Sequence, residues 1–96
     1  MMNILNEAMK VLKLNLKPFD LTNLTKKKTY LCALNDENLL LIYTGKARFI
    51  NKDAIFINNL ANDFDLKYKY FFTKSPLCSK AKHYLEEKGF HIHAIL

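Results

Sequence analysis

The chain has 96 residues, half of them hydrophobic, and a formal net charge of +6. A chain of this length builds one hydrophobic core, and this composition excludes intrinsic disorder. No apolar run reaches the roughly 18 residues of a membrane span, and the N-terminus lacks the basic-then-apolar pattern of a signal peptide. We therefore expect a single soluble domain that is located in the cytoplasm.

The positive charge comes almost entirely from lysine. Fourteen of the fifteen basic residues are lysines, and ten residues are asparagines, a bias typical of an AT-rich genome. The charge still favours a polyanionic partner such as a nucleic acid. The two cysteines, Cys32 and Cys78, are too far apart in the sequence for a metal or redox motif, so we predict two free thiols.

The N-terminal segment has the pattern of an amphipathic helix. Apolar residues recur at helical spacing through residues 1–17, and three lysines recur on the opposite side: Lys10, Lys13 and Lys17. We predict a helix with a basic outer stripe that ends at Pro18. Residues 18–28 mix turn formers with apolar side chains and predict an irregular basic connection, which ends with Lys26, Lys27 and Lys28.

Two β-type runs follow, residues 29–34 and 39–44, with a polar four-residue connection between them. This spacing predicts an antiparallel hairpin. The second run is apolar without alternation, which indicates a strand covered on both faces. We then expect a helix that is capped by Asn51 and ends near Asp65.

The last third of the chain predicts a βαβ unit. An aromatic strand over residues 67–73 leads to a helix capped by Ser75, and Gly89 precedes a strand over residues 91–96. The predicted order is αββαβαβ in one α/β domain with a four-stranded mixed sheet and packed helices. Strands two to four should be parallel, with strand one antiparallel at an edge.

The carboxyl ends of parallel strands are where open α/β sheets bind ligands. Here two loops deliver hydroxyl and basic groups to that edge: Thr44, Lys46 and Arg48 from one, Thr73, Lys74 and Ser75 from the other. These groups predict a phosphate site. The alternative, which we favour because neither loop has the glycines of a phosphate-binding loop, is that Ser75 caps its helix and the lysines are solvated.

Cys78 lies in a segment that is similar to part of a known family. Residues 73–82, Thr-Lys-Ser-Pro-Leu-Cys-Ser-Lys-Ala-Lys, resemble the strand–loop–helix segment of glutaredoxins, whose Cys-Pro-Tyr-Cys motif aligns with residues 75–78. Ser75 stands where that family has its nucleophilic cysteine, and the segment comes late in this chain but early in that family. We therefore do not transfer the activity, and we interpret Cys78 as a buried inert thiol, with a reactive thiol as the alternative.

Other chemistry has little support in the sequence. His91 and His93 alternate on one strand face, with His83 on the preceding helix, but no acidic or cysteine partner lies at ligand spacing, so we predict surface histidines and no metal site. The carboxylates are scattered without the grouping of a nuclease or hydrolase site. The aromatic strand at 67–73 is interpreted as core rather than as a stacking platform for single strands.

The sequence thus favours a binding protein over an enzyme and predicts no cofactor. We expect a lysine-rich surface that binds an anionic partner, most simply a nucleic acid. The alternatives are a protein-interaction module and a thiol- or phosphate-dependent enzyme that uses the strand-end crevice near Cys78. The residues expected to contact the anion are Lys10, Lys13, Lys17, Lys26, Lys27, Lys28, Thr44, Lys46, Arg48, Thr73, Lys74 and Ser75.

Overall fold

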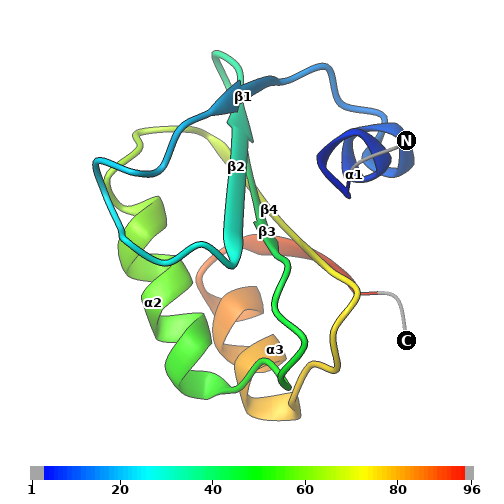
Figure 1. Cartoon of the computed structure of the whole chain (residues 1–96), viewed down its shortest axis with the longest axis vertical. Helices are drawn as coiled ribbons and strands as arrows, with labels where there is room; N and C mark the ends of the chain where they lie inside the picture. The colour runs from blue at the N-terminus through cyan, green and yellow to red at the C-terminus, as the bar shows by residue number, and fades with distance from the viewer. Residues whose placement is uncertain (1–3, 95–96) are drawn as a thin grey trace.

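The computed structural model describes residues 4–94 and shows an α/β domain with helices packed on a mixed sheet, as predicted (Figure 1). The order is αβββαβαβ. The elements are α1 (Ile4–Leu12), β1 (Lys17–Phe19), β2 (Tyr30–Leu34), β3 (Asn38–Tyr43), α2 (Asn51–Ala61), β4 (Tyr68–Thr73), α3 (Ser79–Glu87) and β5 (Phe90–Ala94).

The five strands lie side by side in their sequence order, β1-β2-β3-β4-β5. β1 and β2, and likewise β2 and β3, pair antiparallel, whereas β3, β4 and β5 are parallel. The prediction of three parallel strands and one antiparallel hairpin is confirmed. The prediction of four strands is wrong, because a fifth strand, β1, occupies the edge of the sheet beside β2.

The extra strand explains two corrections near the N-terminus. The predicted helix over residues 1–17 ends at Leu12, because Lys13 has a positive φ of 57° and Lys17 already belongs to β1; residues 1–3 lie outside the described part. Pro18 sits inside β1 opposite Ala33, which an edge strand tolerates. β1 has three exposed residues and no hydrophobic pattern, so its backbone pairing leaves no signal in the sequence.

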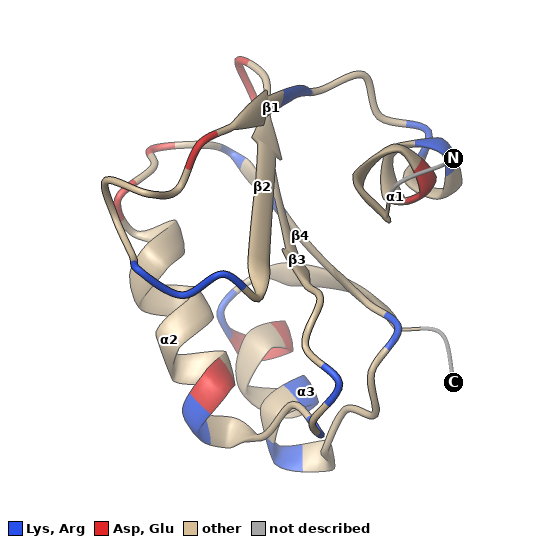
Figure 2. Cartoon of the chain, in the orientation of Figure 1, with Lys and Arg blue, Asp and Glu red and all other residues tan. Residues whose placement is uncertain are grey.

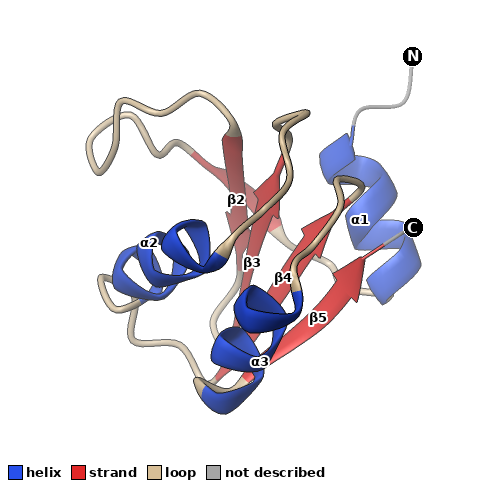
Figure 3. Cartoon of the chain, turned by 90° about the horizontal axis from the view of Figure 1, so that it is seen from below, coloured by secondary structure: helices blue, strands red, loops and turns tan. Residues whose placement is uncertain are grey.

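Two hydrophobic layers enclose the sheet, with α2 and α3 on one face and α1 on the other (Figure 3). β3 supplies both layers: Leu39 and Leu41 face α2 and α3, whereas Leu40 and Ile42 face α1. All four side chains are fully buried. The prediction that this strand is covered on both faces is therefore confirmed.

α2 and α3 each start at a slightly different residue than predicted, so a different residue serves as the N-cap. Ile50, not Asn51, is the N-cap of α2, and the Asp53 carboxylate accepts a hydrogen bond from the Ile50 N–H at 3.0 Å. Cys78, not Ser75, is the N-cap of α3, and its Sγ accepts a hydrogen bond from the Ala81 N–H at 3.4 Å. Ser75 is consequently free to bond elsewhere.

Candidate anion-binding site at one end of the sheet

Three segments that are distant in the sequence meet where β3 and β4 end. β2 starts opposite the end of β3, so the connection that leads into β2 joins the two loops that follow β3 and β4. The Thr44 N–H donates to the Thr29 carbonyl at 2.7 Å, and the Phe49 N–H donates to the Pro76 carbonyl at 2.8 Å. We call residues 26–29, 44–53 and 74–82 the basic end of the molecule.

Hydroxyl groups tie the two strand-end loops together. The buried Thr73 hydroxyl donates to the Tyr43 carbonyl at 3.1 Å and accepts from the Ser75 N–H at 3.1 Å. The Ser75 hydroxyl donates to the Gly45 carbonyl. Thr73 and Ser75, which were predicted to contact a ligand, therefore serve to fix the geometry of the loops, whereas Thr44 remains exposed beside them.

Tyr43 shapes the first loop from within. Its hydroxyl donates to the Ala47 carbonyl at 3.1 Å, and its ring lies 5.1 Å from that of Phe49 between centroids. Burial, and then the nearby Asp53 carboxylate, raise the pKa of Tyr43, so the phenol keeps the proton that it donates. A Cβ at position 45 would overlap this ring, which explains why the loop needs Gly45.

The charge at this end is almost entirely positive. Nine of the fifteen basic residues lie in the three segments, against a single acidic residue, Asp53, which is engaged at the start of α2. Figure 2 shows the basic positions on the loops and on the first turns of α2 and α3. The nine are Lys26, Lys27, Lys28, Lys46, Arg48, Lys52, Lys74, Lys80 and Lys82, and all are exposed.

Three of these lysines were not among the predicted contacts: Lys52, Lys80 and Lys82. They lie in the first turns of α2 and α3, where the helix dipole is positive and a lysine is unfavourable by about 0.3 to 1 kcal/mol. No acidic residue compensates in the first turn of α3. A basic residue in the first turn of a predicted helix is the sequence signal that could have identified these three lysines, because helix stability alone favours an acidic residue there.

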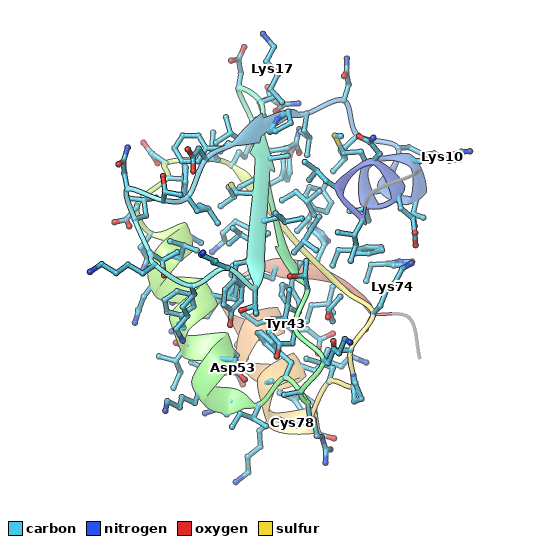
Figure 4. All side chains as sticks on the ribbon, in the orientation of Figure 1. Lys10, Lys17, Tyr43, Asp53, Lys74 and Cys78 are labelled. Carbon is cyan, nitrogen blue, oxygen red and sulfur yellow. The ribbon has the colours of Figure 1, made fainter. Side chains whose placement is uncertain are left out.

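A shallow hollow of about 350 Å³ opens between the two strand-end loops. Thr44, Gly45, Lys46, Lys74 and Ser75 contribute to its lining. The Lys74 ammonium bridges to the Glu7 carboxylate of α1 at 2.7 Å, so its charge is partly compensated. Figure 4 shows Lys74 close to α1, Cys78 near the bottom of the view, and Lys17 at the opposite end from Cys78.

The remaining predicted lysines fall into two groups. Lys26, Lys27 and Lys28 line a separate hollow of about 450 Å³ beside Phe19 and Leu21, and the Lys27 ammonium lies 4.4 Å from the centre of the Phe56 ring. Lys10, Lys13 and Lys17 do not form the predicted stripe, because they belong to a helix, a turn and a strand. The structure thus adds the first group to the basic end and leaves the second outside it.

The thiols and histidines do not converge on a second site. Burial raises the pKa of the Cys32 thiol to about 12, and Cys78 is half-buried at its cap position. His91 and His93 stack on Tyr70 and Phe72 with ring centroids 5.2 and 5.3 Å apart. Within residues 4–94, no three histidine, cysteine or acidic side chains are grouped closely enough to hold a metal ion.

Neither the helices nor the comparisons point to a class of protein. Each helix of the described chain is too short to cross a bilayer. Comparisons with protein-family models, curated proteins and solved structures find no match for this chain.

Proposed function

We propose that the basic end binds the phosphate backbone of a nucleic acid. The observation that carries the proposal is the set of nine exposed basic side chains against one acidic residue in three segments that only the fold brings together. A surface of one sign concentrates polyanions and steers their approach. The N-terminal ends of α2 and α3 add partial positive charge at the same place.

Lysine determines the kind of binding that we expect. Eight of the nine basic residues are lysines, whose compact ammonium lacks the fork with which arginine reads guanine. Binding should therefore follow the phosphates and depend little on base sequence. Counterion release makes such binding strongly dependent on salt.

A fluorescence anisotropy titration with single-stranded and duplex oligonucleotides tests the proposal. With six or more phosphate contacts, affinity should fall by about a thousandfold between 50 and 200 mM salt. The triple variant K46E/R48E/K80E should bind at least tenfold more weakly. Its matched control, K10E/K17E/K67E, changes the net charge equally but lies outside the basic end.

Two outcomes would contradict the proposal. One is an absence of binding at low salt to both kinds of oligonucleotide. The other is an equal loss of affinity in the two triple variants, since this would assign the interaction to net charge rather than to a site.

Exposed apolar side chains give less support to a protein-interaction module. The large ones include Val11 on α1, Phe19 on β1, Ile55 on α2 and Tyr68 on β4. Hydrophobic side chains exposed singly on different elements are ordinary for a globular protein. The charge distribution therefore carries the functional proposal.

A further inference from the structure

The two edges of the sheet are built differently. β1 is three residues long, fully exposed, and contains Lys17 and Pro18, which are residues that block strand addition. β5 is longer, and its sequence Phe-His-Ile-His-Ala has neither a lysine nor a proline. Within residues 4–94, β4 is the only strand that pairs with β5, so its outer edge presents a row of backbone groups (Figure 3).

We propose that β5 pairs with β5 of a second copy of this chain, in an antiparallel arrangement centred on Ile92. This inference is independent of nucleic-acid binding. A two-fold axis perpendicular to the sheet would join the two sheets into one of ten strands and keep each face on its own side. Phe90 would then lie opposite the partner's Ala94, and His91 opposite the partner's His93.

The side chains of α3 supply the charge complementarity that selects this occupant. Lys82 and Glu86 are four residues apart, so they project from the same side of the helix. Lys82 lines a hollow of about 210 Å³ together with Leu77, Ile92 and Ala94, which places that side of α3 toward β5. One cation and one anion therefore border the open edge.

The positions of Lys82 and Glu86 along β5 agree with a two-fold axis at Ile92. Lys82 lies beside Ile92 and Ala94, and α3 runs opposite to β5. Four helical residues rise about 6 Å, the length of about two strand residues, so Glu86 lies roughly level with His91. The two charges thus stand on either side of Ile92. In the antiparallel pair, Lys82 faces the partner's Glu86, and Glu86 faces the partner's Lys82.

The whole-molecule charge favours the same orientation. The carboxyl end of the parallel strands is strongly basic, whereas residues 35–37, 62–69 and 86–89 at their amino end carry six acidic and three basic side chains. Antiparallel pairing of β5 sets the basic end of each copy beside the acidic end of the other. A parallel pairing would set like ends together.

Sedimentation velocity at concentrations of about 100 µM tests the proposal. The wild-type protein should sediment with the mass of a dimer, twice the chain mass of 11.2 kDa. K82E should weaken the dimer at least tenfold, because the introduced carboxylate would face the partner's Glu86, and the swap K82E/E86K should restore it. H91K/H93K should likewise dissociate the dimer, whereas H91K/H93E should not, since each introduced lysine would then face an introduced carboxylate.

Circular dichroism must show that each variant keeps its fold, and K80E serves as a control that lies on the other side of α3. A monomeric wild type overturns the proposal. So does a dimer that neither K82E nor H91K/H93K weakens, since pairing would then use another surface. A dimer that K82E/E86K fails to restore, or that H91K/H93E dissociates, also overturns the proposal, since pairing would then use another register.

Discussion

The two ends of the parallel strands carry opposite charge although the same topology builds both. The three segments at the carboxyl ends of β3 and β4 hold nine basic residues and one acidic residue, and Glu7 of α1 pairs with one of the nine, Lys74. The segments at the amino ends carry six acidic residues and three lysines. A lysine-rich composition by itself would scatter charge over both ends. The segregation is therefore a property of this fold. It places lysines at the N-terminal ends of α2 and α3, where the positive end of the helix dipole makes a positive charge destabilising.

The ends also differ in how their loops are held. At the basic end, side chains of one loop bond to the backbone of another: Thr73 to the Tyr43 carbonyl and Ser75 to the Gly45 carbonyl. At the acidic end, Asn35 closes its own turn by accepting from the N–H groups of Glu37 and Asn38. The basic end thus depends on long-range contacts, and the hairpin turn depends on local ones.

The largest expected effect comes from the glycines, of which each end has one. Gly45→Ala should lower the free energy of unfolding by about 3 kcal/mol, because the new Cβ displaces the buried Tyr43 ring. Gly89→Ala meets only the Lys69 side chain at an ordinary contact distance of 3.9 Å, so the positive φ of 88° should cost only about 1 kcal/mol. Urea denaturation of both variants measures the difference. Equal losses would show that Tyr43 does not shape the basic end.

A smaller effect should follow from removing the loop hydroxyls. Thr73→Val keeps the side-chain shape but leaves the Tyr43 carbonyl and the Ser75 N–H without this partner, at a cost of about 1 to 2 kcal/mol. The variant should also bind nucleic acid more weakly, since the lysines of the two loops lose their fixed spacing. Asn35→Ala should lower stability to a similar extent but leave binding unchanged, and a parallel loss of binding would contradict the assignment of the site.

The smallest effect has the opposite sign. Lys80→Glu at the start of α3 should raise the free energy of unfolding by about 0.5 kcal/mol, because a carboxylate suits the positive end of the helix dipole. Glu87→Lys in the last turn should stabilise the protein to a similar extent. Thermal melts measure both changes. Only Lys80→Glu should weaken nucleic-acid binding, and a loss in both variants would remove the distinction between the two ends.

The sequence alone determined the architecture of residues 29–94 because the signals there are local. The apolar run of β3 predicts burial on both faces, and each helix between parallel strands requires a crossover, so the parallel orientation of β3, β4 and β5 could be predicted. The position of β5 in the sheet could not, because a crossover does not fix on which side of the earlier strands the last one lies. The exact helix starts could not, because Ser75 and Asn51 are good caps by type. Thr73 and Ser75 bond across to the neighbouring strand and loop instead, which a residue's own neighbours do not reveal.

Only the tertiary structure decided which lysines lie at the same end of the molecule. Lys26–28, Lys46 and Lys80 belong to three different segments, and they share one end because β2 starts where β3 and β4 stop. The edge strand β1 was equally hidden, since its three exposed residues pair through the backbone and not through a pattern of side chains. The local sequence pattern indicates burial and secondary structure. The grouping of exposed charges depends instead on the order of the strands in the sheet, because that order decides which loops meet.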